Sequence, residues 1–423
     1  MAPFDTADTK PDLSQILRVF TRIGLMSFGG PAAQIAVMHK ELVEDRPWLS
    51  EQQFLSALSF CMLLPGPEAM QLCTYAGWRL RGVTGGLIAG LLFILPGAAV
   101  MMALAWAYAS WGDVPLVHAM FLGIKATVVV IVVQALIRLG QKTLKHRVHW
   151  LISLTAFLAL YLFGAPFPLV IASAALIGAI FLRGASDPPA PIQKTPHRQS
   201  MLQPVLWLAL WLAPVALAMG LGATTLADIG LFFSKLAVVS FGGAYAVLAY
   251  MAQATVETHG WVTPGQMLDG LGLAETTPGP LILVTQFIGF MTGYNIAGTG
   301  LAIAAALMTL WTTFVPCFLW IFTAAPHVDW LTTRPRLSAA LSGITAAVVG
   351  VIANLSLWFA LHVFFHDTTT LAPLSATVPV PTSLDLKALA LTGLAAMFLT
   401  RISLPLTLLC MAIAGGGLSI AFG

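Results

Sequence analysis

The chain has 423 residues, of which 58% are hydrophobic and only 9% are charged, whereas soluble domains carry about 25% charged residues. This composition excludes a soluble globular protein and indicates an integral membrane protein. The formal net charge of +3 is small, and the lysines and arginines lie scattered between apolar runs, which also excludes nucleic-acid binding.

The N-terminal residues are polar and lead into no cleavable signal. Asp5, Asp8, Lys10 and Asp12 are followed neither by an apolar leader nor by a small-residue cleavage site. We therefore expect the N-terminus to stay in the cytoplasm. The four cysteines match neither a disulfide framework nor a zinc site, and we expect no metal and no cofactor.

Four short apolar segments follow, at residues 13–29, 31–45, 51–64 and 67–78. At about 1.5 Å per residue, each reaches only about half to two thirds of the way across a membrane. Gly29-Gly30 and Pro65-Gly66-Pro67 separate them, and glycine suits the end of a helix while proline suits the start of the next. We predict two helical hairpins that enter from the cytoplasmic side and break near the middle of the membrane.

Longer apolar runs of membrane-spanning length come next, at residues 84–109, 116–138, 201–221 and 301–325. Between the second and third of these, residues 183–200 are polar and rich in proline, which is typical of a linker.

The breaks of the first half recur in the second half, 213 positions later and without a gap. Phe28-Gly29-Gly30 returns as Phe241-Gly242-Gly243, and Pro65-Gly66-Pro67 returns as Pro278-Gly279-Pro280. This self-similarity divides the chain into a first repeat at residues 1–183, a linker with an unpaired helix at 184–222, and a second repeat at 223–423.

The unpaired helix at 201–221 would turn the second repeat upside down. Cytoplasmic loops are enriched in lysine and arginine, and the basic residues do change sides: Arg79-Leu80-Arg81 corresponds to the uncharged Tyr294-Asn295-Ile296. We therefore predict an all-α polytopic membrane protein with two inverted-topology repeats, whose broken, re-entrant half-helices meet near the midplane. The C-terminus is then expected in the periplasm.

Each break would direct free N–H groups and the positive end of a helix dipole at the membrane centre, where they could bind an anion. The alternative is that these motifs only permit kinks or close packing of helices. The substrate-binding candidates at the breaks are Ser27, Gly29, Gly30, Pro65, Gly66 and Pro67, and their counterparts Ser240, Gly242, Gly243, Pro278, Gly279 and Pro280.

Two cations occupy the same repeat position before the glycine pairs. Arg22 and Lys235 could together neutralise a divalent anion, or they could snorkel to the interface or pair with an acid. Both are further substrate-binding candidates.

Two acids lie beside the proline breaks and are candidates for proton coupling. Glu68 follows the first break and Glu275 precedes the second; an acid at low dielectric can exchange a proton during transport. For Glu68 the alternative is a helix cap. The pathway candidates are Lys125, which could instead be a counter-charge for either acid, and Gln71, Gln286 and Asn354, which could instead hold neighbouring helices together.

Six motifs of the chain form a distinctive set. They are Ser27-Phe28-Gly29-Gly30, Trp48-Leu49-Ser50, Leu64-Pro65-Gly66-Pro67, Gly77-Trp78-Arg79-Leu80-Arg81-Gly82, Ser240-Phe241-Gly242-Gly243 and Thr276-Thr277-Pro278-Gly279-Pro280. With these motifs the chain resembles the chromate ion transporter family in its long, two-domain form. The resemblance implies efflux of chromate across the bacterial inner (plasma) membrane and chromate resistance, with sulfate as a structural mimic. The second repeat departs from the first, with Ala244 in place of Pro31 and Leu281 in place of Glu68, so identical roles are not expected.

Three alternatives to a chromate exporter stay open. They are a sulfate or other anion carrier working in either direction, a passive channel, and a membrane-embedded enzyme. The enzyme is disfavoured because a metal-binding His-Glu-x-x-His pattern is absent from the sequence. The partners expected are a chromate-like or sulfate-like oxyanion, protons as coupling ion and membrane lipids, with a homodimer left open.

Overall fold

The computed structural model describes residues 11–112, 114–182, 202–241, 243–327, 334–371 and 374–422. Within them the chain is almost wholly helical, with one antiparallel hairpin of two short strands, β1 (Thr368–Thr370) and β2 (Thr377–Pro379). The expected all-α class is confirmed. Five described helices are long and apolar enough to cross a membrane, as a polytopic protein requires: α4 (Glu68–Trp111), α5 (Pro115–Thr143), α8 (Leu202–Gly220), α13 (Thr299–Ala324) and α15 (Pro335–Phe364).

The first half begins with the expected short helices. They are α1 (Leu13–Met26), α2 (Gly30–His39) with the turn η1 (Lys40–Glu44), and α3 (Glu51–Cys61). The chain leaves helical geometry at both predicted breaks, where Gly29 and Gly66 have φ angles of 81° and 120° that favour glycine. The two closing helices are α6 (Arg147–Phe163) and α7 (Phe167–Phe181).

Helix α4 contains the fourth predicted short segment and the first predicted long run. The two are separated by a kink, because Arg81 and Gly82 leave helical backbone angles, and Gly82 has a φ of 62°. The structure therefore keeps the two segments that the sequence predicts, joined at this kink and carrying the single label α4.

The second half repeats the same succession of elements. The shared local details include a serine or threonine capping box at the same repeat position, Ser50 with Gln53 and Thr263 with Gln266. The elements are α9 (Thr224–Val239), α10 (Ala244–Gln253), η2 (Ala254–Thr258), α11 (Pro264–Thr276), η3 (Leu281–Leu283), α12 (Val284–Ala297), α13, η4 (Ala325–His327), α15, η5 (Pro381–Ser383), α16 (Leu386–Leu399) and α17 (Leu404–Phe422).

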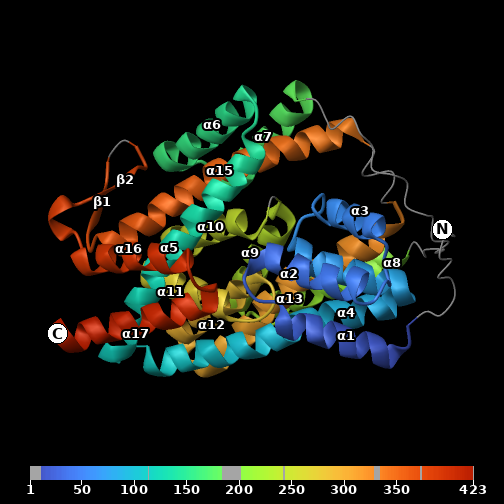
Figure 1. Cartoon of the computed structure of the whole chain (residues 1–423), viewed down its shortest axis with the longest axis horizontal. Coiled ribbons are helices and arrows are strands. Elements are labelled where there is room, and N and C mark those ends of the chain that lie inside the picture. The colour runs from blue at the N-terminus through green and yellow to red at the C-terminus, as the bar shows by residue number, and fades with distance from the viewer. Residues whose placement is uncertain are drawn as a thin grey trace.

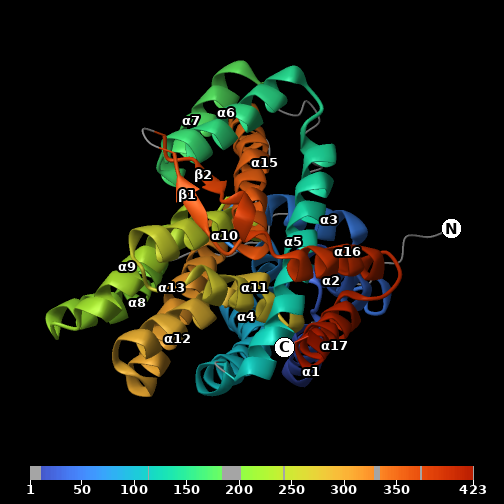
Figure 2. The same cartoon turned by 90° about the vertical axis from the view of Figure 1, so that its left-hand side faces the viewer.

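Each half covers a long helix of the other half. Helices α6 and α7 pack on α15, and α16 and α17 pack on α5, as Figures 1 and 2 show. Helix α8, which has no counterpart, packs on α9 and α13. The two halves therefore form one interlocked body.

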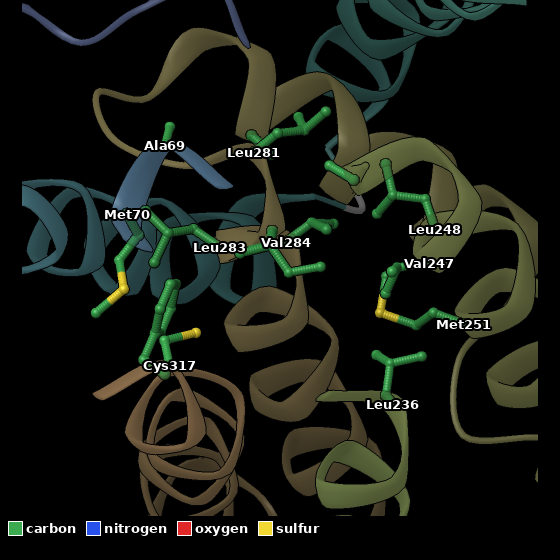
Figure 3. Close-up of a cluster of buried hydrophobic side chains, with 14 of the residues drawn as sticks. Ala69, Met70, Leu236, Val247, Leu248, Met251, Leu281, Leu283, Val284 and Cys317 are labelled. Atoms are coloured by element: carbon green, nitrogen blue, oxygen red, sulfur yellow. The ribbon is translucent and has the colours of Figure 1, made fainter. Parts of the chain in front are cut away.

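An apolar cluster surrounds the breaks. Figure 3 shows Met70 at the start of α4, Leu236 of α9, Met251 of α10, Leu283 of η3 and Cys317 of α13 gathered around the same centre. Because these side chains come from both halves and are buried, their packing fixes the breaks of one half against those of the other.

A buried ion pair joins α5 to α11 in the same region. Lys125 Nζ lies 3.3 Å from a carboxylate oxygen of Asp269, and both side chains are nearly buried. The Tyr108 hydroxyl of α4 donates a hydrogen bond of 2.8 Å to the same carboxylate. The carboxylate of Asp269 thereby links the three helices α4, α5 and α11.

We expect Gly97→Ala to destabilise the protein. A Cβ at Gly97 of α4 would overlap the backbone carbonyl oxygen of Pro278, and backbone at that depth has little room to move. Such overpacking costs about 1–3 kcal/mol. Thermal unfolding of the purified protein in detergent measures the effect. Gly393→Ala in α16 is the matched control, because nothing lies within 4 Å of its added Cβ; equal midpoints for the two variants would contradict the close contact.

Breaking the Lys125–Asp269 pair on one side should be strongly destabilising. Lys125→Met alone leaves a nearly buried carboxylate without its cation, and loss of one partner in such pairs costs about 3–5 kcal/mol. The double variant Lys125→Met/Asp269→Asn removes both charges and keeps an acceptor for Tyr108, so it should regain much of that loss in the same unfolding assay. A double variant no more stable than Lys125→Met would show that the charge pair is not what matters.

Candidate functional site

The predicted breaks of the two halves meet through their backbones. The Gly279 N–H donates a 2.7 Å hydrogen bond to the carbonyl oxygen of Ser27, and the Gly66 N–H donates a 2.9 Å hydrogen bond to the carbonyl oxygen of Ser240. Each residue of the first bond is the repeat counterpart of a residue in the second. The glycine of each proline break is thus bonded to the serine of the other half.

Because of these bonds, some of the N–H and hydroxyl groups that were predicted to bind an anion are already occupied within the protein. The Gly66 and Gly279 amides are used between the halves, and the hydroxyls of Ser27 and Ser240 donate to carbonyl oxygens of their own helices, Ile23 and Ala237. Amides remain free at the first turns of α2, α4 and α10 and of η3, where no side chain caps the helix.

A cavity of about 480 Å³ opens at the starts of α2, α4 and α10. Its wall includes the first turns of α2 and α10, the first residue of α4, and the last third of α5. Apolar side chains of α15 and of the turn between α16 and α17 complete it. The cavity therefore has contributions from both halves, and three positive helix-dipole ends face it.

Helix α5 contributes the only basic residues among the described lining, Arg138 and Lys142. With Gln134 they are spaced by four residues and share one face of the helix. Neither cation has a hydrogen-bond or ion-pair partner within 4 Å among the described residues, and both are exposed to the open space. These two charges are available to a ligand.

Two acids face the same cavity, and both were predicted to lie near the breaks. Glu68 is the first residue of α4, and Glu275 lies in the last turn of α11. Glu275 is 3% exposed and accepts a hydrogen bond of 2.9 Å from the Tyr245 hydroxyl of α10. Two cations and two acids thus converge on one space.

The cavity lies on only one side of the pair of halves. Helices α2 and α5 both line it and do not pack closely on each other, whereas their counterparts α10 and α15 are packed together. On that closed side lies a pocket of about 40 Å³, with Asn354 in its wall. Equivalent helices of the two halves therefore pack differently: α10 contacts α15, whereas α2 does not pack closely on α5.

The break residues are divided between the cavity and the packed core. Gly29, Gly30 and Gly243 line the cavity. Gly66, Pro67 and Ser240 line a smaller pocket of about 20 Å³ that shares Gly243 with it, a volume near that of one water site. Gly242 lies outside the described residues. The remaining break residues line neither of these two spaces: Ser27, Pro65, Pro278, Gly279 and Pro280.

The matched cations of the sequence prediction are placed elsewhere. Arg22 Nε lies 3.1 Å from the buried carboxylate of Glu41, which also binds Arg46. Lys235 Nζ lies over the ring of Tyr250, 5.8 Å from its centroid. Neither residue lines the cavity, because a nearby acid holds the first and an aromatic ring attracts the second.

Three of the four pathway candidates, all but Asn354, are engaged in packing contacts. Gln71 donates from its side-chain amide to the carbonyl oxygen of Pro65, and Gln286 donates to that of Ala98. Lys125 is paired with Asp269 and with neither Glu68 nor Glu275. These contacts match the alternative that such side chains hold neighbouring segments together.

Sequence analysis missed Arg138, Lys142 and Tyr245 as site residues. Arg138 ends the apolar run predicted at residues 116–138, and Lys142 follows that run. Their spacing from Gln134 was the available signal, since it places one amide and two cations on one helix face. Tyr245 had no comparable signal, because its partner Glu275 is 30 residues away.

Comparison with known proteins gives a consistent result. A family model described as chromate transporter matches residues 14–179 and 227–417. The chain is 32% identical to a chromate transport protein of Pseudomonas aeruginosa, with 80% of this chain and 79% of that protein covered. It is also 32% identical to a probable chromate transport protein of Synechococcus elongatus (81% and 83% covered) and 29% identical to a chromate transport protein of Cupriavidus metallidurans (81% of each). No solved structure matches the chain. The chain therefore belongs to the chromate transporter family.

Proposed function

We propose that this protein is a secondary transporter that moves chromate, or a similar tetrahedral oxyanion, out of the cell across the bacterial inner membrane. The family supplies the substrate class, since three relatives are named as chromate transport proteins or probable ones. The observation that carries the proposal at residue level is the pair of unpartnered cations, Arg138 and Lys142, in a cavity that three helix N-termini face.

The chemistry of the cavity suits a doubly charged anion. Arginine can give two parallel hydrogen bonds to one tetrahedral oxyanion, and lysine adds a compact point charge. Uncapped N–H groups at the starts of α2, α4 and α10 supply further donors, with the positive dipole ends behind them. Two cations match the two negative charges of chromate or sulfate. The site therefore consists of the glycine break at Gly29-Gly30, Gly243, and the basic face of α5.

We further propose that the two halves, residues 1–183 and 223–423, are inverted copies that work by alternating access. Two observations support this. The first is that Gly66 bonds to Ser240 while Gly279, the repeat counterpart of Gly66, bonds to Ser27, the counterpart of Ser240. Such a reciprocal pair of contacts is typical of two copies related by a two-fold axis. The open α2–α5 side and the packed α10–α15 side are what one state of such a carrier requires. In the other state, α2 would close on α5 while α10 separates from α15.

The direction of transport follows from the expected topology. With the N-terminus in the cytoplasm, the basic end of α5 lies on the cytoplasmic side, and the cavity is then loaded from the cytoplasm. An inside-negative membrane potential expels anions, and each charge moved gains about 2.3 kcal/mol per 100 mV. Chromate resistance would be the consequence of this efflux.

Neutralising Arg138 or Lys142 should impair transport. Hydrogen bonds to charged groups contribute about 1.5–3 kcal/mol each, so Arg138→Gln and Lys142→Gln should lower chromate transport at subsaturating concentration roughly tenfold or more. The assay is uptake of chromate into everted membrane vesicles, where efflux is seen as accumulation, with competition by sulfate in parallel and protein amounts checked.

Lys145→Gln is the matched control, because Lys145 follows α5 and does not line the cavity. It should transport like the unmodified protein, as should Arg22→Gln and Lys235→Gln if they fold. Normal transport by both cavity variants, with loss in Arg22→Gln and Lys235→Gln, would move the substrate site away from α5. If everted vesicles with the unmodified protein accumulate no chromate, the proposed export function is wrong.

A further inference from the structure

Four ionisable side chains of opposite charge share the cavity, and the proposed anion must compete with two of them. The cations are Arg138 and Lys142 of α5, and the acids are Glu68 of α4 and Glu275 of α11. The Tyr245 phenol of α10 is the other titratable group in the described wall, and Cys61 of α3 lies near enough to Glu68 to interact with it. Helices α2 and α15 contribute only glycine, proline and apolar side chains to the described lining.

We propose that the anion and protons bind this cavity together, with Glu275 as the principal proton acceptor and Glu68 as the second. This inference rests on the proposed function. Proton and oxyanion would then cross the membrane in the same direction, as a loaded unit of lower net charge than the free dianion.

The charge balance of the cavity requires such a link. When both acids are ionised they offset the two cations, and a dianion then adds two uncompensated negative charges inside a low-dielectric space. When both acids are protonated, the two cations match the dianion. The same two cations can therefore balance either the acids or the substrate. Because linkage is reciprocal, anion binding favours proton uptake as much as protonation favours anion binding.

Glu275 is the stronger candidate for the first proton because of its surroundings. It is buried, its printed partner is the neutral Tyr245 hydroxyl, and no cation lies within ion-pair distance of it among the described residues. Glu68 instead sits at the first position of α4, where the positive dipole end favours its charged form. One proton per anion at neutral pH follows, with a second only in more acidic solution.

Tyr245 would transmit the change to the anion. The two oxygen atoms lie 2.9 Å apart, so with Glu275 ionised the phenol donates its hydrogen to the carboxylate. When Glu275 takes a proton from solvent, its O–H can donate to the phenol oxygen, and the phenol hydrogen becomes free to donate into the cavity. With a single proton, the loaded unit still carries one net negative charge, so an inside-negative potential still expels it.

The test is a count of the protons taken up on anion binding. Purified full-length protein is titrated calorimetrically with sulfate or chromate at about pH 8, where both anions are dianions and any proton taken up belongs to the protein. Repeating the titration in two buffers of different ionisation enthalpy gives the number of protons. We expect an uptake of about one proton per anion for the unmodified protein.

The variants separate this inference from a purely structural role. Glu275→Gln, a neutral mimic, should bind the dianion about tenfold more tightly at pH 8 with uptake near zero, whereas Glu68→Gln should keep most of the uptake. Tyr245→Phe should weaken binding and retain the proton count. Asp228→Asn, an exposed acid of α9 away from the cavity, is the matched control and should change nothing.

Binding without proton uptake by the unmodified protein, or an unchanged count in Glu275→Gln, overturns the linkage and leaves the proposed function standing. Failure of the unmodified protein to bind either anion overturns the proposed function and the linkage with it.

Discussion

Non-helical backbone at the middle of a membrane protein must find its hydrogen-bond partners within the protein. The two reciprocal bonds between Gly66 and Ser240, and between Gly279 and Ser27, meet this requirement at the breaks. Each half satisfies the exposed backbone of the other, so neither set of broken helices is complete alone. The apolar cluster around Met70, Leu236 and Leu283 surrounds the same place, and hydrogen bonds in such apolar surroundings are stronger than in water.

This interlocking explains why the proposed anion site is displaced from the proline breaks toward α5. The proline breaks are committed to backbone bonds and to close packing, as the contact of Gly97 with Pro278 illustrates. The uncapped starts of α2, α4 and α10 face the cavity that Arg138 and Lys142 also line. The packed proline breaks thus form the central contact between the halves, and the charged side chains of the cavity lie beside it.

The outer helices are exchanged between the two halves. Helices α6 and α7 of the first half pack on α15 of the second, and α16 and α17 of the second half pack on α5 of the first. The long helix of each half is therefore held by helices of the other. The unequal packing of α2 with α5 and of α10 with α15 is the geometric feature on which the proposed carrier mechanism would act.

The sequence by itself determined the membrane class, the family, the duplicated order of elements and the residues at which helices break. These depend on composition, on gapless self-similarity and on the local backbone preferences of glycine and proline, all of which act over a few residues. Gly29, Gly66 and Pro67 could therefore be identified correctly as break residues without coordinates. The positions of Glu68 and Glu275 near the breaks were likewise evident from their neighbours in the chain.

Only the tertiary structure decided which charges face the cavity and which are paired. Arg22 and Arg138 are both arginines in or beside apolar segments, but the first meets Glu41 across its hairpin and the second has open space before it. Partners such as Lys125 and Asp269, or Tyr245 and Glu275, lie far apart in the chain and meet only when helices of different segments pack. The local sequence does not predict such long-range contacts, because the free energy of a buried charge depends on the neighbouring groups that the fold places around it.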